Sequence, residues 1–381
     1  MVATRCADAG RASARLKARS PGADTASVET TSERPGDPSP RSVPATPSSA
    51  WADILEYARR YPSPHNTQPI KLRIEGPRAE LFYDLDLGLP AESYGIPFGS
   101  VCAGVFIETV SIAAHGLGYR VDEALDFTPM DFTRRDRLHP LGTLTLTPAL
   151  AGSPGDLDPR LLLERRTSRL PYAPRQVPAA ALDDARRAAA ERGHVLAGTS
   201  DRALVDRIIR LNQQTLFYDL ENPDVRDEIR GWLRYSERHA RRTADGLSAR
   251  CLALPGPLMR LFLGNHWIWN VPALGAVLRR VYLRSMRGVT QAGWIKGPFS
   301  DEREYTEAGR TLLRVWLVLT RHGLHLHPFG SVITNPRAHR ELVRIVAEQE
   351  GADMIWMLFR VGYSRRPPES HRRSVVEMRL A

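Results

Sequence analysis

The sequence predicts an α+β protein, in which helices and strands alternate in two rounds and helices are in excess in the second round. Short alternating stretches broken by Gly and Pro predict strands, and apolar residues three and four positions apart predict helices. The 381 residues, 42% hydrophobic and 25% charged, have the composition of an ordinary globular protein and suffice for one large core or two modest ones.

The first round follows an N-terminal stretch that we expect to be a disordered tail. Residues 1–50 are rich in Ser, Thr, Pro, Arg and Ala and hold almost no large apolar side chains. A helix is predicted from Trp51, where Trp51, Ile54 and Leu55 share one face, and it must end before Pro62. The rest of this first half, residues 51–150, is predicted to contain a hairpin at 70–75 and 79–84, a helix at 100–116, and strands near 119–127 and 141–147.

The second round, residues 151–381, opens with L-L-L-E-R-R-T-S-R at 161–169. Its distinguishing feature is a long stretch, about 205–300, that reads as mostly helical with Pro and Gly breaks. This stretch carries four of the seven tryptophans, Trp232, Trp267, Trp269 and Trp294. The other predicted elements are helices at 178–192, 303–322 and 336–349, strands at 194–197 and 354–362, and a loop H-L-H-P-F-G-S.

The charge distribution and the cysteine content narrow the classes of binding partner and the cellular compartment. The net charge of +10 could suggest nucleic acid, but the arginines are scattered among 43 acidic residues instead of forming one basic run, so we expect no nucleic-acid partner. An anionic small ligand suits the charge equally well. No stretch of 18 apolar residues lacks a charge or proline, so we expect no spanning helix and no membrane partner. Three widely spaced cysteines favour a reducing compartment, and we expect a cytoplasmic location.

The most informative string is P-S-P-H-N-T-Q-P, Pro62 to Pro69, between a predicted helix and a predicted strand. Its prolines restrict the backbone and leave polar side chains free to hydrogen-bond a ligand, although a rigid polar turn is the alternative interpretation. The string resembles the A-P-S-x-x-N-x-Q-P-W loop of the nitroreductase family, which in that family lines the FMN site across a subunit interface. The resemblance implies FMN contacts from Ser63, Pro64, His65, Asn66 and Gln68.

Two further strings are similar to motifs at the phosphate end of FMN in that family. E-R-R-T-S-R at 164–169 resembles R-R-S-x-R, and guanidiniums with hydroxyls can bind a phosphate through bidentate hydrogen bonds. The C-terminal S-R-R-P-P-E-S-H-R-R is similar to the family's closing strand and R-R-P-L. Each string alone also fits a solvated helix end or a basic tail. The resemblance implies phosphate contacts from Arg165, Arg166, Thr167, Arg169, Arg372 and Arg373, and contacts over the flavin ring from Pro328, Gly330 and Ser331.

The distribution of these strings implies how the chain is organised. The first half has the Pro-Ser-Asn loop without an Arg motif before it, and the second half has the Arg motif without a second loop. The resemblance, over residues 51–200 and 305–380, therefore implies a nitroreductase-like fold of two tandem halves that form an internal pseudo-dimer. It also implies one composite FMN site per chain, in a monomer or homodimer. Residues 205–300 lie outside the resemblance, and their tryptophans and their Pro and Gly breaks lead us to expect a helical lid over the flavin. Ile70 departs from the family's Trp after Q-P.

The function that the resemblance implies is an FMN-dependent oxidoreductase, in which the flavin carries the redox chemistry and the protein positions it. It would reduce nitro or quinone-like acceptors, or dehydrogenate a small molecule, with NAD(P)H or another redox partner. The alternative is a flavoprotein that sequesters or stores FMN under the lid without NAD(P)H turnover. A weaker third interpretation is a membrane-surface protein, based on the apolar strings around Trp267.

Other classes of site find no support in the sequence. No acid–base pair stands out, so the catalytic residues stay unassigned. His322, His325 and His327 lack an acidic or cysteine partner at metal-ligand spacing, and we expect no metal site. No Rossmann, P-loop or α/β-hydrolase motif is present.

Overall fold

The computed structural model describes residues 46–150, 157–265, 271–346 and 354–380. Most of the predicted tail, residues 1–50, lies outside these ranges. The first helix, α1 (Pro47–Ala58), begins before the predicted Trp51 because Thr46 caps it. The Thr46 hydroxyl accepts a hydrogen bond from the Ser49 backbone N–H, and Pro47 occupies the first helical position.

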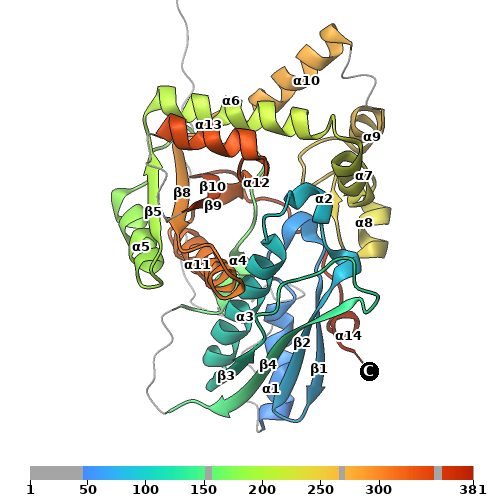
Figure 1. Cartoon of the computed structure of the whole chain (residues 1–381). Coiled ribbons are helices and arrows are strands. Elements are labelled where there is room, and N and C mark those ends of the chain that lie inside the picture. Colours follow the sequence, from blue (N-terminus) through green and yellow to red (C-terminus); the bar gives the residue numbers. More distant parts are fainter. Residues whose placement is uncertain (1–45, 151–156, 266–270, 347–353, 381) are drawn as a thin grey trace, which may run out of the picture. The chain divides into compact units, whose positions relative to one another are not determined.

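The first sheet is antiparallel and has the strand order β1-β2-β4-β3. Gly142 lies at an irregularity in the β2–β4 pairing with φ +114°, and a Cβ there would stand 2.3 Å from the Ala124 carbonyl oxygen. Helices α1 and α3 (Phe98–Gly116) pack on one face of this sheet (Figure 1). The strands are β1 (Ile70–Glu75), β2 (Arg78–Asp84), β3 (Tyr119–Leu125) and β4 (Leu138–Pro148), which confirms the predicted hairpin.

The second sheet is also antiparallel, with the order β5-β8-β10-β9. Trp356 and Phe359 on β10 enter one apolar core, and Ile355 and Leu358 enter another, so the sheet is buried on both faces. Helices α5 and α11 cover one face, and α6, α12 and α13 cover the other (Figure 1). The strands are β5 (Val195–Thr199), β8 (Gln291–Gly297), β9 (His325–Pro328) and β10 (Met354–Gly362). The helices are α5 (Ala179–Ala190), α6 (Arg202–Asp219), α11 (Glu302–Arg321), α12 (Gly330–Thr334) and α13 (Pro336–Val346).

Strand β8 is an exception within residues 205–300, which are predicted to be mostly helical with Pro and Gly breaks. All of its residues except Lys296 are buried, so it lacks the alternation that marks a half-exposed strand. Trp294 on this strand therefore belongs to the core of the sheet. The predicted loop H-L-H-P-F-G-S likewise divides into β9 and the short helix α12.

Helices α3 and α11 bring the two sheets together. The two helices cross at Gly104 of α3 and Gly309 of α11. A Cβ on Gly104 would stand 1.9 Å from the Thr306 carbonyl oxygen, and a Cβ on Gly309 would stand 2.0 Å from that of Val101. Only glycine permits this close approach of two helix backbones.

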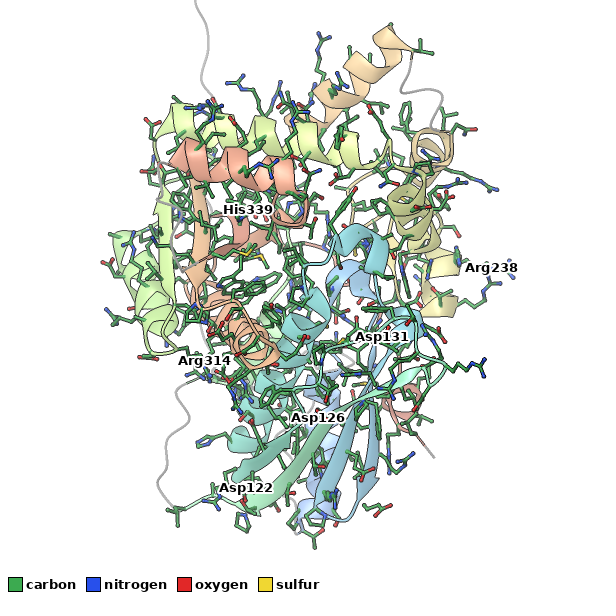
Figure 2. The ribbon with its side chains drawn as sticks, in the orientation of Figure 1. Asp122, Asp126, Asp131, Arg238, Arg314 and His339 are labelled. Atoms are coloured by element: carbon green, nitrogen blue, oxygen red, sulfur yellow. The ribbon has the colours of Figure 1, made fainter. Side chains whose placement is uncertain are left out.

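A buried acid stabilises the same crossing. The Glu108 carboxylate on α3 pairs with Arg314 at 2.6 Å, with Arg192 at 3.0 Å and with Arg310 at 3.5 Å. Figure 2 labels Arg314 on α11 at this crossing. Helix α3 is apolar and long enough to cross a membrane, with a mean hydropathy of 1.4, but 78% of that window is buried inside the protein, as in a core helix.

The stretch between α6 and β8 contains short elements. Two-residue strands β6 and β7 pair in parallel, and we call residues 231–251, which contain them, the strap. Arg238 on the strap projects outward (Figure 2). Trp267 and Trp269 lie outside the described residues. The elements here are α7 (Pro223–Gly231), β6 (Leu233–Arg234), α8 (Glu237–Thr243), β7 (Leu247–Ser248), α9 (Gly256–Gly264) and α10 (Pro272–Ser285). The remaining short helices are η1 (Pro64–Asn66), η2 (Leu85–Leu87), α2 (Pro90–Ser93), α4 (Arg160–Glu164) and α14 (Val375–Met378).

Candidate functional site

Four chain segments, 60–66, 162–169, 247–251 and 368–372, meet around an open depression that we call the arginine depression. It holds about 660 Å³ of free space, counted out to solvent. The predicted site residues that line it are Ser63, His65, Asn66, Arg165, Arg166, Thr167, Arg169 and Arg372. The predicted residues that do not line it are Pro64, Gln68, Pro328, Gly330, Ser331 and Arg373.

The loop Pro62–Pro69 reaches this depression in a strained conformation. His65, Asn66 and Gln68 have φ angles of 46°, 58° and 56°, in the left-handed region that residues other than glycine rarely adopt. Ser63 closes the turn, because its hydroxyl accepts a hydrogen bond of 3.0 Å from the Gln68 backbone N–H. Backbone strain of this kind persists where surrounding contacts enforce it, and it gathers at binding sites.

The Asn66 side chain lies at the edge of the depression but is used by the protein. Its Nδ2 donates to the carbonyl oxygens of His371 at 3.0 Å and Gly246 at 3.2 Å, and its Oδ1 accepts from Arg372. The amide is therefore a junction between the loop, the strap and the C-terminal segment. Only the second lone pair of Oδ1 is left for a ligand.

Gln68, for which a ligand contact is predicted, is buried and does not line the depression. Its Nε2 donates to the carbonyl oxygens of Asn66 at 3.2 Å and Ala244 at 3.0 Å. Its Oε1 accepts from the Arg373 backbone N–H at 2.9 Å. Because all of these partners are protein groups, the side chain fastens the strap and the C-terminal segment to the loop.

Three arginines at the depression, Arg165, Arg169 and Arg372, have no carboxylate partner among the described residues. Arg165 Nη2 donates to the Arg60 carbonyl oxygen at 3.1 Å, and its guanidinium lies 4.5 Å from the centre of the Trp316 ring. Arg372 donates only to Asn66, and Arg169 forms no hydrogen bond within the part of the chain that is described.

Burial and the repulsion from neighbouring arginines lower the pKa values of these three guanidiniums. Burial, followed by the nearby Arg372 and Arg166, lowers the pKa of Arg165 to about 9. Burial lowers the pKa of Arg372 to about 10 and also lowers the pKa of Arg169. All three remain protonated at neutral pH, so three positive charges line the same depression.

Two more arginines share a single acid at the rim. Arg60 and Arg166 both pair with Glu369, Arg166 at 3.3 Å. The Nε atoms of Arg60 and Arg166 are buried and lack a hydrogen-bond partner among the described residues. Five arginines and one carboxylate therefore line the depression, so the described residues leave its positive charge unbalanced.

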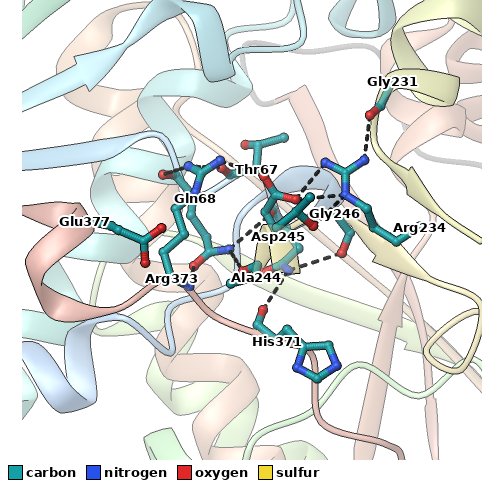
Figure 3. A network of polar contacts seen from close by, with 12 residues as sticks. Thr67, Gln68, Gly231, Arg234, Ala244, Asp245, Gly246, His371, Arg373 and Glu377 are labelled. Atoms are coloured by element: carbon teal, nitrogen blue, oxygen red, sulfur yellow. Dashed lines mark hydrogen bonds and ion pairs between the residues drawn. The ribbon is translucent and has the colours of Figure 1, made fainter. Parts of the chain in front are cut away.

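Arg373, for which a phosphate contact beside Arg372 is predicted, points to a different network. Its Nη2 pairs with one oxygen of Asp245 at 2.7 Å, and the other oxygen accepts from Arg234 Nη2 at 2.6 Å and Nε at 2.9 Å (Figure 3). Arg373 also donates to the Thr67 carbonyl oxygen at 3.0 Å. Neighbouring residues of an extended segment point in opposite directions, so Arg372 and Arg373 do not face the same ligand.

The loop predicted to lie over a flavin ring is regular structure. Pro328 pairs with Phe359 at the end of β9, and Gly330 and Ser331 begin α12. His327 on β9 has a titratable side chain of the kind found in functional sites. Burial, followed by Arg360 and Arg169, lowers its pKa well below the usual value, so the imidazole is neutral.

His65 of the loop and Glu92 of α2 are two uncharged side chains that lie next to each other. His65 Nδ1 and Glu92 Oε2 lie 3.2 Å apart without hydrogen-bond alignment, and neither atom has another partner among the described residues. Burial, then Glu228 and Asp219, raises the pKa of Glu92 to about 8. Burial, then Arg169, lowers the pKa of His65 to about 3. At neutral pH the imidazole carries no charge and the carboxyl holds its proton.

Some lining residues were not predicted from the sequence. Arg60 stands two positions before Pro62, and Glu369 and Ser370 lie inside the C-terminal string, so proximity to a motif was a usable signal. Leu247 and Cys251 come from the strap, where no local pattern points to a site. The unpredicted lining residues with side-chain chemistry are Arg60, Cys251, Glu369 and Ser370.

Comparison with known proteins gives only distant likenesses. No family model and no curated protein matches the chain. It is similar to the FMN-dependent nitroreductase NfnB from Mycobacterium smegmatis in complex with NADPH, at 16% identity over 57% of this chain and 94% of that chain, with a TM-score of 0.37. It is similar to iodotyrosine deiodinase bound to FMN and 3-iodo-L-tyrosine, at 14% identity over 56% of this chain and 94% of that one, with a TM-score of 0.33. A nitroreductase with bound FMN from Bacteroides fragilis matches at 11% identity over 57% and 92%, with a TM-score of 0.33. At such values the function has to be argued from the residues of this chain.

Proposed function

We propose that the arginine depression binds the phosphate end of FMN and that the protein is an FMN-dependent oxidoreductase of the nitroreductase type. One observation carries the proposal: Arg165, Arg169 and Arg372 converge on one depression without a carboxylate partner among the described residues. Charges kept together in this way are costly unless an anion joins them. The resemblance of the loop and Arg strings to that family supports the same ligand.

The donor chemistry fits a phosphate monoester. Such a group carries nearly two negative charges at neutral pH and accepts several hydrogen bonds, which guanidiniums satisfy in pairs. The hydroxyls of Ser63, Thr167 and Ser370 line the same depression and can donate to the remaining phosphate and ribityl oxygens. Bound phosphate would also relieve the repulsion between Arg165 and Arg372.

The rest of the loop would orient the cofactor. When bound, FMN supplies hydride and electron transfer between a donor and an acceptor. The residues of the chain bind it, hold the strained loop against it and keep nearby groups neutral. His65 lines the depression as an uncharged imidazole with protonated Glu92 behind it, so it can exchange a hydrogen bond with a ligand without adding charge to the site. We propose nitro or quinone-like acceptors, or a small molecule to be dehydrogenated, with NAD(P)H as the redox partner.

We further propose that the chain is organised as two tandem halves, 51–150 and 151–381. Each would contribute a four-stranded sheet, with α3 and α11 crossing between them as an internal pseudo-dimer. The loop comes from the first half and Arg165 from the second, which supports one composite site per chain. We propose a cytoplasmic protein, because the two described cysteines, Cys102 and Cys251, are buried free thiols.

A second candidate function is FMN sequestration without NAD(P)H turnover. It is favoured by the strap, which is fastened to the loop through Asn66 and Gln68 and to the C-terminal segment through Asp245. The strap also adds Leu247 and Cys251 to the depression. A segment held in this way would restrict access to a bound cofactor. Stopped-flow mixing with NADH and NADPH separates the candidates, because only the oxidoreductase bleaches the flavin absorption at a useful rate.

The proposed cofactor is tested on purified protein. We expect FMN at one per chain, released by heating and identified by chromatography. FAD, two FMN per chain, or failure of the protein to take up added FMN would contradict the proposal. Inorganic phosphate should compete with FMN binding, since both would occupy the arginines.

A further inference from the structure

We propose that a second depression, separate from the first, is a binding site for a small organic cation, such as an aromatic or alkyl quaternary ammonium compound. It lies on the other side of the Pro62–Pro69 loop: Pro64 and Thr67 line it, whereas Ser63 and His65 line the arginine depression. It holds about 920 Å³ of free space, counted out to solvent. We call it the aromatic depression.

The lining combines aromatic side chains with one carboxylate. Four aromatic side chains, those of Tyr83, Phe98, Phe132 and Tyr305, border it together with the Met130 thioether. The faces of aromatic rings carry negative partial charge and attract cations within about 6 Å, an arrangement that recognises quaternary ammonium groups. Thioethers add a soft, polarisable surface suited to methyl groups.

The charge of the lining has the sign that the ligand requires. Glu302 is the only charged side chain among the lining residues, although the whole chain has a net charge of +10. One of its oxygens accepts from Ser100 Oγ, and the other has no hydrogen-bond partner among the described residues. The neighbouring cation Arg303 does not line the depression and lies instead 4.2 Å from the centre of the Phe127 ring.

The aromatic wall is fixed before any ligand arrives. The segment that carries Met130 and Phe132 is held by two tight turns, in which Asp126 accepts from Thr128 and Asp131 accepts from Thr133. Figure 2 shows Asp126 and Asp131 on this connection between β3 and β4. Phe132 packs edge-on against Tyr83 with ring centres 6.4 Å apart.

Glycines allow this wall to sit close to the helices. A Cβ on Gly88 would stand 2.3 Å from the Phe132 ring, and one on Gly99 would stand 2.7 Å from Met130 Sδ. Phe132 and Met130 both belong to the proposed site, so the two glycines determine how closely the aromatic wall approaches the backbone at positions 88 and 99. A rigid, prepared pocket loses little entropy on binding, which favours even a small ligand.

The test is calorimetric titration of the full-length protein with benzyltrimethylammonium, benzyl alcohol and benzoate at constant ionic strength. We expect the cation to bind at least tenfold more tightly than the neutral alcohol and benzoate not to bind measurably. Equal affinity for the cation and the alcohol would overturn the proposal. This comparison uses the wild-type protein, so it does not depend on any variant folding.

Two variants then locate the site. Glu302→Gln should weaken cation binding at least tenfold and leave benzyl alcohol unaffected, and Phe132→Leu should weaken the cation more than the alcohol. Glu341→Gln, which removes a carboxylate of α13 paired with Arg344 outside the depression, is the matched control and should bind the cation as the wild type does. Unchanged cation affinity in folded Glu302→Gln, or an equal loss in Glu341→Gln, would show that the cation binds elsewhere. FMN content should be the same in all variants, which keeps this result separate from the proposed function.

Discussion

At the scale of single residues, the charge state of buried groups connects structure to binding. Arg165 is 7% exposed and remains charged without a carboxylate beside it, because its guanidinium rests on the Trp316 ring and donates to a backbone carbonyl. Such a group contributes little to the stability of the protein alone. Its contribution comes when an anion binds.

Arg165→Ala should therefore weaken FMN binding strongly. Charge-assisted hydrogen bonds contribute about 1.5–3 kcal/mol each, so loss of a bidentate contact should raise the dissociation constant of FMN by two orders of magnitude or more. Arg187→Ala is the control, because Arg187 is exposed on α5 and pairs with Asp184. Fluorescence titration of apo protein with FMN measures both, and similar affinities would show that Arg165 does not hold the phosphate.

Glu92 should make the protein less stable as the pH rises from about 4.5 to about 8. Its folded-state pKa is raised to about 8 by burial, Glu228 and Asp219, whereas the unfolded value is 4.5. The folded state therefore holds a proton that the unfolded state has released, and stability is lost as pH rises towards 8. The folded-state pKa of His65 is lowered to about 3 from an ordinary value of 6.5. His65 therefore affects stability mainly below about pH 6.5, where stability falls as the pH falls.

Urea unfolding between pH 6.5 and 8 isolates the contribution of Glu92. The free energy of unfolding should fall by roughly 2 kcal/mol over this window because of Glu92, at up to about 1.4 kcal/mol per pH unit. Glu92→Gln should remove most of that slope, and Glu341→Gln should keep it. Parallel slopes for wild type and Glu92→Gln would mean that the Glu92 carboxyl is ionised in the folded protein.

At the scale of elements, the Pro62–Pro69 loop is held by tertiary contacts and not by its own sequence. Three residues with positive φ stay in place because Asn66 and Gln68 bind the strap and the C-terminal segment. The strap is in turn held by Asp245 between Arg234 and Arg373 (Figure 3). The loop, the strap and the C-terminal segment therefore form one unit.

Gln68→Ala should loosen this unit. It leaves the Arg373 backbone N–H and the Ala244 carbonyl oxygen without partners, and each unsatisfied buried group costs about 1–3 kcal/mol. We expect the free energy of unfolding to fall by about 2–4 kcal/mol in urea denaturation. Gln214→Ala on the exposed face of α6 should change it by less than about 0.5 kcal/mol. If the two variants unfold alike, Gln68 does not join the segments.

Prediction from the sequence succeeded where the signal was local. The hairpin at β1 and β2, the helix α3 and the helix α11 follow from residues within one element. Strand β8 was missed because burial on both faces erases its alternation, and the direction of Arg373 was missed because it depends on Asp245, more than a hundred residues away. The loop and Arg strings do line one depression, but Gln68 turned out to hold the loop and not to face that depression.

At the scale of the whole molecule, both halves of the chain meet at the arginine depression. Arg165 Nη2 donates to the Arg60 carbonyl oxygen at 3.1 Å, so the first and second halves touch within one polypeptide. Arg60 also lines the depression and pairs with Glu369 near the C-terminus. This arrangement predicts that a single chain holds a complete site, whatever its oligomeric state.

Complementation between two defective variants tests that prediction. Arg60→Ala removes a lining guanidinium from the first half and Arg165→Ala removes one from the second. If two chains exchanged halves to build their sites, a mixed dimer of these variants would contain one intact site and recover FMN binding. With each site inside one chain, every site keeps one defect, so co-expressed variants carrying different affinity tags should bind no more FMN after tandem purification than either variant alone. Each variant must first show the far-ultraviolet circular dichroism of the wild type, so that loss of FMN reflects the missing guanidinium. Recovery of about half the wild-type FMN in the doubly tagged sample would place the site between chains and refute the single-chain arrangement.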